Sequence, residues 1–271
     1  MADTTQPTED APAAHAGPPR RYLSRIALTL GLVGTGVVLV VTIGVRDPSS
    51  GGVPAAAPPS PSPSFVVQEQ RPQPGVQVPR VGLAAPPDRP TVSDEAELET
   101  WARRVAGKTQ IPQRLVAAYG RAEMWMTRQK PACHLSWATL AGIGHTNFGE
   151  IALTDSGDAT PPVIGPATAA DTDHGELDGD RRADHKVGPM QFLPATWSKY
   201  AERATSDGNP PNPQNIDDAA FTAARYLCSG GDDLGTPSGW WRAALFYDPA
   251  VDHAQTVFDA ADAFAAASVS V

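Results

Sequence analysis

Apolar residues follow three different patterns along the chain. Residues 26–45 carry no charge, and about 20 residues at roughly 1.5 Å each cover the ~30 Å of a bilayer's hydrocarbon. Residues 46–91 show no periodicity and are rich in Pro, Ala, Ser and Gly. Residues 92–271 have apolar side chains at the spacing of helix faces. The pattern therefore predicts a transmembrane helix, a linker and one globular domain.

The globular part predicts a succession of amphipathic helices. The first has an acidic first turn at residues 93–96 and ends at Gly107, the second follows Pro112, and the third begins near Trp137. Four more are expected at residues 195–200, 217–227, 239–247 and 251–266. Residues 153–186 hold turn formers and acids and predict a long loop. Because no stretch alternates like a strand, the expected fold class is mainly α.

The charges around residues 26–45 predict the topology. Arg20, Arg21 and Arg25 precede the span, whereas Arg46 and Asp47 follow it. The excess of positive charge before the span favours a cytoplasmic tail at residues 1–25 and an extracytoplasmic C-terminal domain in a single-pass protein of the cell membrane. The alternative is a cleaved signal peptide, whose apolar core is usually about 7 to 15 residues. The longer run favours a retained anchor.

Residues 46–91 have too few large apolar side chains to repay the ordering of the chain, so this segment is expected to be a disordered linker. In a polyproline-like state of ~3.1 Å per residue it would reach on the order of 100 Å. Such a spacer suits a domain that works on the cell wall. A stalk of no specific function is the alternative.

Charge and cysteine content exclude some functions. The net charge of −9 leaves no basic surface for a phosphate backbone, so we expect no nucleic-acid partner. Nothing in the sequence calls for a cofactor, and none is expected. Cys133 and Cys228 are the only cysteines and lack metal-ligand spacing. In an oxidising compartment they favour a disulfide.

Four segments carry a family resemblance. Residues 187–197 read V-G-P-M-Q-F-L-P-A-T-W, an acidic stretch at residues 171–180 precedes them, and residues 213–231 follow. Together with residues 137–150, these segments resemble the lytic murein transglycosylases of the membrane-bound B type, particularly the anchored forms of high-GC Gram-positive bacteria. The resemblance covers roughly residues 95–262. Cys133 and Cys228 also stand where such relatives carry a cysteine pair.

The resemblance implies a lysozyme-like domain that acts on the glycan strands of peptidoglycan. The family cleaves between N-acetylmuramic acid and N-acetylglucosamine and leaves a 1,6-anhydro product. The matching positions predict substrate-binding residues at Met190, Gln191, Phe192, Tyr247 and Asp248. Gln191 could instead be a capping or buried glutamine, and Tyr247 a core aromatic. Asp248 departs from the asparagine that the family has there.

The catalytic position also departs from the family. A single glutamate serves there as acid and then as base, and residues 140–150, L-A-G-I-G-H-T-N-F-G-E, place Asn147 at its position and Glu150 at the position of a histidine. An amide has no proton to donate near neutral pH and is a feeble base. Glu150 shares the helix face, but it starts about 4.5 Å further along the axis. A solvated loop carboxylate is the alternative for Glu150.

Other acids crowd residues 171–184, namely Asp173, Glu176, Asp178, Asp180 and Asp184. Their crowding suggests calcium, but they do not satisfy the ligand pattern of an EF-hand. Solvated acids of a turn are the favoured interpretation, and the sequence leaves metal binding open.

Two functions compete. The first is an enzyme that still cleaves the glycan, with Glu150 or an acid of residues 171–184 as the recruited proton donor. The second is a catalytically inactive module, a pseudoenzyme, that binds peptidoglycan in cell-wall remodelling or division; the sequence names no protein partner. A purely structural stalk protein would require Gln191 and Tyr247 to be buried.

Overall fold

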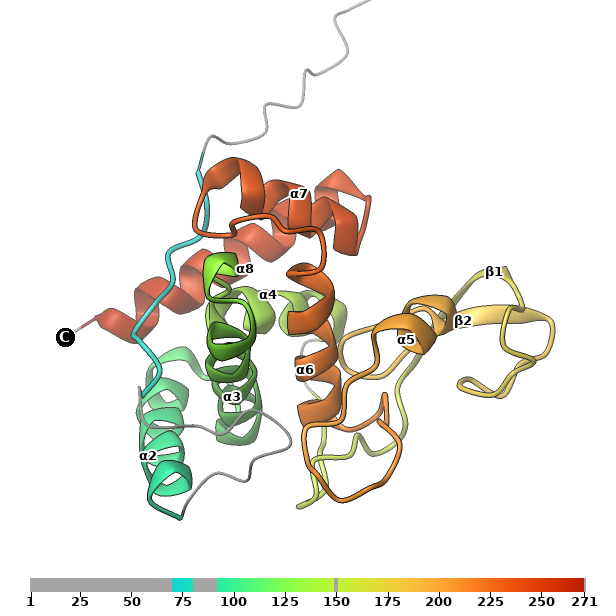
Figure 1. The fold of residues 1–271 in the computed structure, drawn as a ribbon, viewed down its shortest axis with the longest axis horizontal. Coiled ribbons are helices and arrows are strands. Elements are labelled where there is room, and N and C mark those ends of the chain that lie inside the picture. The colour runs from blue at the N-terminus through green and yellow to red at the C-terminus, as the bar shows by residue number, and fades with distance from the viewer. Residues whose placement is uncertain (1–69, 80–91, 149–150, 271) are drawn as a thin grey trace, which may run out of the picture. The chain divides into compact units, whose positions relative to one another are not determined.

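The computed structural model describes residues 70–79, 92–148 and 151–270 (Figure 1). Every helix predicted from the apolar periodicity is present, and this part of the chain is mainly helical. The elements are α2 (Val92–Thr109), α3 (Gln113–Gln129), the 3-10 turn η1 (Pro131–Cys133), α4 (Trp137–Phe148), β1 (Ile164–Ala170), β2 (Ala183–Val187), α5 (Pro194–Tyr200), α6 (Ile216–Leu227), α7 (Pro237–Tyr247) and α8 (Val251–Val269).

The expected transmembrane helix at residues 26–45 and the tail before it lie outside the described residues. None of the helices in the described ranges is both long and apolar enough to cross a bilayer.

Helix α4 lies at the centre of the helical body and packs against α3, α6 and α8 (Figure 1). All of its residues from Trp137 to Gly144 are buried. The indole of Trp101 from α2 meets that of Trp137 edge-on, with ring centroids 5.6 Å apart. Because the first two turns are fixed in the core, the last turn of α4 can hold Asn147 in a defined place at the edge of the body.

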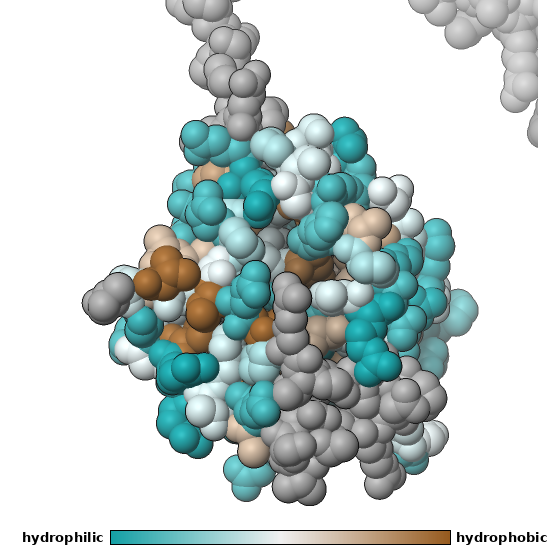
Figure 2. All heavy atoms as spheres, turned by 60° about the vertical axis from the view of Figure 1, so that its left-hand side comes forward, coloured by the Kyte–Doolittle hydropathy of each residue, from teal (hydrophilic) through white to brown (hydrophobic). Residues whose placement is uncertain are grey.

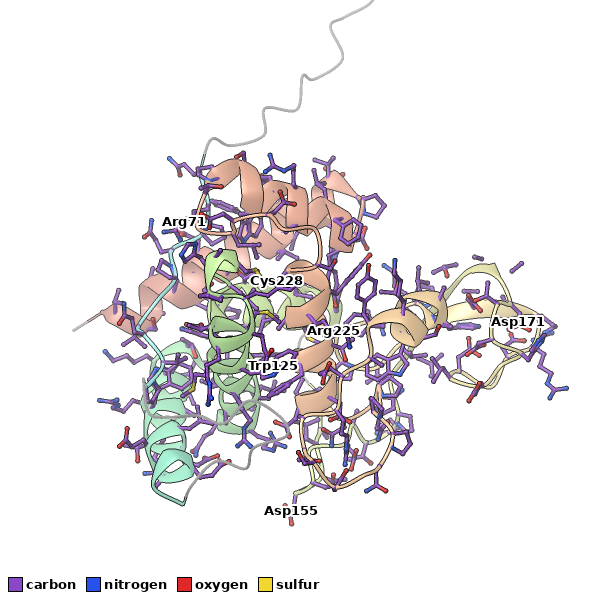
Figure 3. The ribbon with its side chains drawn as sticks, viewed as in Figure 1. Arg71, Trp125, Asp155, Asp171, Arg225 and Cys228 are labelled. Atoms are coloured by element: carbon purple, nitrogen blue, oxygen red, sulfur yellow. A yellow bond between two sulfur atoms is a disulfide. The ribbon has the colours of Figure 1, made fainter. Side chains whose placement is uncertain are left out.

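A disulfide joins Cys133 in η1 to Cys228 at the C-terminal end of α6, with a Cα–Cα distance of 5.7 Å (Figure 3). The expected pairing is therefore confirmed. The backbone around it is also joined, because Lys130 Nζ donates to the carbonyl of Cys228 at 3.1 Å. The bridge closes the end of the α3–α6 pair.

The side chain of Glu123, in α3, accepts a hydrogen bond from the N-terminus of a different helix, α4. Its Oε2 accepts a hydrogen bond from the backbone N–H of Trp137 at 2.6 Å, at the point where α4 begins. Burial raises the pKa of Glu123 to about 8, and the hydrogen bond from Trp137 opposes that rise only in part. The folded state therefore holds a proton on Glu123 that an unfolded chain releases near its usual pKa.

This raised pKa predicts a stability that falls with pH. Because the folded protein binds the extra proton between about pH 5 and pH 8, its free energy of unfolding should decrease across that range. Glu123→Gln keeps an acceptor for Trp137 and cannot ionise. We expect the variant to be more stable than wild type at pH 8 by on the order of 2 kcal/mol. This figure is smaller than the full pKa shift implies, because part of the Glu123 side chain reaches solvent. Urea unfolding at pH 5 and 8 measures this, with exposed Glu97→Gln as control; an unchanged pH dependence would refute the assignment.

The long loop predicted at residues 153–186 is wrong in part, because it contains an antiparallel hairpin of β1 and β2. Ala170 pairs with Ala183 and Ile164 with Val187, and two irregularities interrupt the register between them. Strand β1 is almost wholly exposed. Its sequence therefore has neither an apolar face nor an alternating pattern from which a strand could be predicted. The hairpin and its connecting loop form an arm that leaves the helical body (Figure 1).

Residues 70–79, which composition assigned to the linker, lie along the helical body (Figure 1). They have no helix or strand, yet Pro72 is buried and four hydrogen bonds tie the segment to three helices. We call this segment the strap. It belongs with the globular part of the chain.

Candidate functional site at the end of helix α4

Three segments that are distant in the sequence meet at the main-chain carbonyl of Met190. Asn147, in the last turn of α4, donates its Nδ2–H to this oxygen at 3.3 Å. The hydroxyl of Tyr247, the last residue of α7, donates to the same oxygen at 2.6 Å. The structure thus brings together Asn147, Met190 and Tyr247, all of which the sequence singled out.

The side chains around Met190 have less access to a ligand than expected. Met190 and Phe192 are 0% and 2% exposed, so their side chains belong to the core. The ring of Phe192 packs against those of Trp197 and Tyr247, at centroid distances of 5.4 and 5.7 Å. Met190 can meet a ligand only through its main chain, and Phe192 supports the ring of Tyr247 from behind.

Gln191 is a buried glutamine, which was the alternative to a sugar-binding role. Its φ of +54° is in the left-handed region, and its side chain turns back so that Nε2 donates to the carbonyls of Gly188 at 3.0 Å and Lys186 at 3.3 Å. It is 9% exposed. The donors expected to bind a sugar therefore hold the turn after β2, whereas Tyr247 remains partly exposed.

Asp248 forms an ion pair with Lys186 of β2 at 2.6 Å. Burial disfavours the charged carboxylate, but the hydrogen bonds from Lys186 and from the Ala250 N–H outweigh it and keep the pKa of Asp248 below its usual value. The residue stays ionised near neutral pH, so it is unsuited to donate a proton. Its charge is balanced by Lys186.

A cavity of about 380 Å³ adjoins the end of α4. Its lining includes Tyr119, Gly144, His145, Pro189 and Phe264, so it begins one residue before Met190 and one turn before Asn147. The size lies in the lower range of small-ligand sites. The cavity therefore gives the site near Asn147 a concave neighbour in which a ligand can be held.

Tyr119 is a residue of this site that the sequence interpretation placed on an apolar helix face. Burial raises its pKa well above the usual value, so the phenol stays neutral. A Cβ at Gly144 would lie 2.1 Å from the Tyr119 hydroxyl oxygen, and therefore only glycine lets the phenol cross α4 here. A glycine in the middle of an otherwise buried helix was the signal that could have marked this contact.

The acidic side chains of the arm form hydrogen bonds within the arm itself. Asp184 is 3% exposed and accepts bonds from the N–H and hydroxyl of Thr172 at 2.8 and 2.6 Å, so the prediction that it is solvated is wrong. Asp173 and Asp178 accept backbone N–H groups of the same loop. The Arg182 side chain lowers the pKa of Asp180 to about 2. These carboxylates therefore hold the arm together.

One group of carboxylates within the described ranges has donor atoms close enough to share a metal ion. One oxygen each of Asp171, Asp173 and Asp184 lie within 4.8 Å of one another, and hard divalent cations prefer such ligands. All three also accept hydrogen bonds from loop N–H groups. Figure 3 shows Asp171 on the arm, away from the helical body. The group is therefore separate from the site at Asn147.

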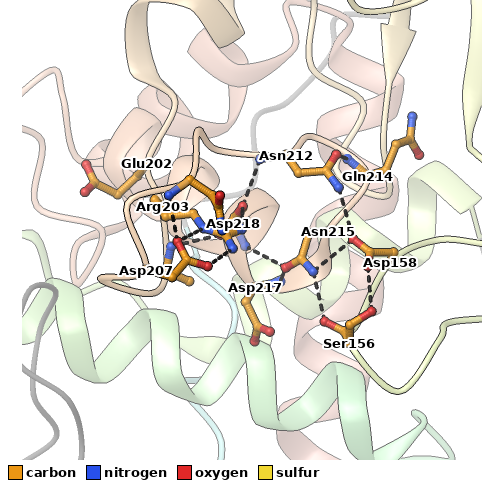
Figure 4. A network of polar contacts seen from close by, with 12 residues as sticks. Ser156, Asp158, Glu202, Arg203, Asp207, Asn212, Gln214, Asn215, Asp217 and Asp218 are labelled. Atoms are coloured by element: carbon orange, nitrogen blue, oxygen red, sulfur yellow. Dashed lines mark hydrogen bonds and ion pairs between the residues drawn. The ribbon is translucent and has the colours of Figure 1, made fainter.

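A second polar network joins the loops that flank the start of α6 (Figure 4). Asp218, 1% exposed, accepts from Arg203 Nη1 at 2.6 Å and from the N–H groups of Ala204 and Asn212. Asn212 and Asn215 donate to Asp158 at 3.0 and 3.1 Å. Since Arg203 supplies the positive charge that buried Asp218 needs, this network is complete without an ion.

Glu150, the expected substitute acid, lies outside the described residues. Comparison with known proteins finds no matching family model, no similar curated protein and no similar solved structure. The geometry of the site is therefore the evidence on which a function can be argued.

Proposed function

We propose that this chain is a membrane-anchored protein whose extracytoplasmic, lysozyme-like domain binds the glycan strands of peptidoglycan and has lost the cleavage reaction of the lytic transglycosylases that it resembles. The observation that carries the proposal is the position of Asn147. Its amide shares the Met190 carbonyl with Tyr247, beside a cavity of about 380 Å³. A site of this shape suits binding, and it holds an amide where a proton donor is needed.

The described side chains around Asn147 support the loss of catalysis. Asp248 is ionised and paired with Lys186, and burial keeps the phenols of Tyr119 and Tyr247 neutral. A general acid must release a proton near neutral pH to a leaving oxygen within hydrogen-bond reach. None of these three groups has such a pKa.

The support for binding comes from the cavity and its rim. His145 and Phe264 both line it, His145 is exposed, and the two rings meet edge-on with centroids 5.3 Å apart. Aromatic rings provide flat apolar contact together with a polar edge, which suits a sugar ring. The buried amide of Gln191 weakens one part of the expected sugar contact, so we assign recognition to the cavity side of α4.

Binding to purified peptidoglycan sacculi tests the proposal. Protein lacking residues 1–64 should sediment with sacculi and release almost no anhydromuramyl product. His145→Asn should weaken binding about fivefold, since it removes one ring contact worth about 1 kcal/mol. His174→Asn, at a histidine of the arm whose side chain is 94% exposed, is the matched control and should bind like wild type.

Two results would overturn the proposal. Absence of sacculus binding by wild type would refute a glycan site of any kind. Rapid release of anhydromuramyl products, abolished by Glu150→Gln, would show that the chain is an active enzyme with a displaced proton donor.

A further inference from the structure

The strap, Gln70–Pro79, is bonded to the helical body along most of its length. Trp241 Nε1 of α7 donates to the carbonyl of Gln70 at 2.9 Å, and the N–H of Gln73 donates to Asp262 of α8 at 2.9 Å. Val76 forms two hydrogen bonds with the helical body. Its carbonyl accepts from Trp137 Nε1 of α4 at 3.1 Å, and its N–H donates to Ser268 Oγ of α8 at 2.9 Å.

Two of these bonds satisfy the N–H groups of buried indoles. Trp137 is 0% exposed and Trp241 is 3% exposed. A buried N–H without an acceptor is energetically costly. Without the strap, the helices would present both indole N–H groups without their acceptors. The surface formed by Trp137, Trp241 and Ser268, which we call the strap groove, is therefore built to receive main-chain carbonyls.

The strap has the properties of a preorganised ligand for this groove. Its prolines at 72, 74 and 79 restrict φ and favour an extended chain, which reduces the entropy lost on docking. Gly75 has a φ of +75°, and a Cβ there would lie 2.9 Å from Trp137 Cζ2 and 3.0 Å from Ser268 Oγ. Only glycine fits at the closest approach. Figure 2 shows the side of the domain along which the strap runs, where apolar side chains interrupt a polar surface.

We propose that the strap groove is a binding site for an extended proline-rich peptide, and that its ligand is this chain's own residues 70–79. Aromatic grooves bind proline-rich segments in the same physical way, because a stiff chain offers carbonyls at fixed spacing and loses little entropy. The groove lies at the N-terminal end of α4, and Asn147 lies in its last turn. Docking of the strap therefore leaves the candidate glycan site open.

The docked strap sets the length of the tether. Ten residues released into a polyproline-like chain of ~3.1 Å per residue would add about 30 Å between the domain and whatever holds residues before 70. The groove thus fixes where the linker meets the domain. This inference is independent of the proposed glycan function.

Hydrogen exchange of the full chain in detergent tests the docking. In wild type, the amides of Gln73 and Val76 should exchange at least tenfold more slowly than in a free peptide of residues 70–79. Gly75→Ala should abolish this protection, whereas Gly107→Ala, whose new Cβ meets nothing within 4 Å, should leave it unchanged. Gln73→Pro, which removes the N–H that Asp262 accepts and fixes φ at residue 73, provides a second variant within the strap and should speed exchange at Val76.

Peptide binding tests the groove itself. A synthetic peptide of residues 70–79 should bind the Gly75→Ala chain at least tenfold more tightly than wild type, whose groove is filled, and the same peptide with alanine at 75 should bind neither. Unprotected amides in wild type, or equal binding of both peptides, would overturn the proposal. Protection that depends on protein concentration and accompanies a dimer would overturn the intramolecular assignment, because the strap would then come from a second copy.

Discussion

Removing the disulfide by the double substitution Cys133→Ser and Cys228→Ser is expected to lower the free energy of unfolding by about 4 to 5 kcal/mol. The bridge spans 95 residues of sequence, and the chain-entropy model assigns that size of effect to a loop of about this length. The two cysteines are 4% and 1% exposed, so the serine hydroxyls would add a burial penalty. Chemical denaturation of oxidised and reduced wild type separates the two contributions, because reduction removes only the bond.

The bonds that flank the disulfide help to interpret this experiment. Lys130 Nζ donates to the Cys228 carbonyl, and the N–H of Leu234 donates to the Cys133 carbonyl at 2.8 Å. These bonds keep the native geometry available to the reduced protein. We therefore expect reduced wild type to fold to the same structure with lower stability. Equal stability of the oxidised and reduced forms would contradict the assignment of the bridge as a stabilising link.

The helices could be predicted from the sequence because each buries one face against neighbouring elements of the fold. Leu98, Trp101 and Val105 mark the buried face of α2, and all are at most 2% exposed. Thr236 caps the start of α7, where its hydroxyl oxygen accepts the N–H of Gly239. Apolar periodicity in a sequence indicates an element that is buried on one side. The helices are buried in this way, so they could be recognised.

The hairpin and the strap could not be predicted in this way because neither has a periodic apolar face. Strand β1 is held by main-chain pairing with β2, and the carboxylate of Asp184 in β2 binds Thr172 just after β1. A search for apolar faces registers neither interaction. The strap reads as linker because prolines and glycine are typical of disorder. Its docking depends on Trp137 and Trp241, which are distant in the sequence and lie in α4 and α7.

The residues Asn147, Met190 and Tyr247 were anticipated from the family resemblance, and the placement of the helices explains how they meet. Asn147 and Tyr247 end α4 and α7, and the motif at residues 187–197 places Met190 between them. The roles of Gln191 and Phe192 were not predictable from residue type, because an amide or a ring serves equally well in a cleft or in a buried turn. The left-handed backbone conformation of Gln191 determines which of these two roles its side chain takes.

Asn147→Glu is expected to raise the rate of glycan cleavage by 10² or more over wild type, the range in which a positioned acid or base contributes. The Asn147 amide already donates to the Met190 carbonyl, and a protonated carboxyl can make the same bond. A carbonyl that accepts this proton, together with a partly buried position, favours the protonated form and raises the carboxyl pKa towards the useful range. The new residue could then act as acid first and as base afterwards.

The control is Asn147→Gln, which has the length of glutamate and no acid. It should bind sacculi like the glutamate variant and remain inactive, so that any gain is due to the ionisable group. Asn147→Asp tests reach, because it keeps the original chain length. The measurement is the release of anhydromuramyl products at pH 5 to 8. Equal activity of the glutamate and glutamine variants, with binding retained, would show that Asn147 does not face the scissile bond and that the catalytic part of the resemblance fails at this position.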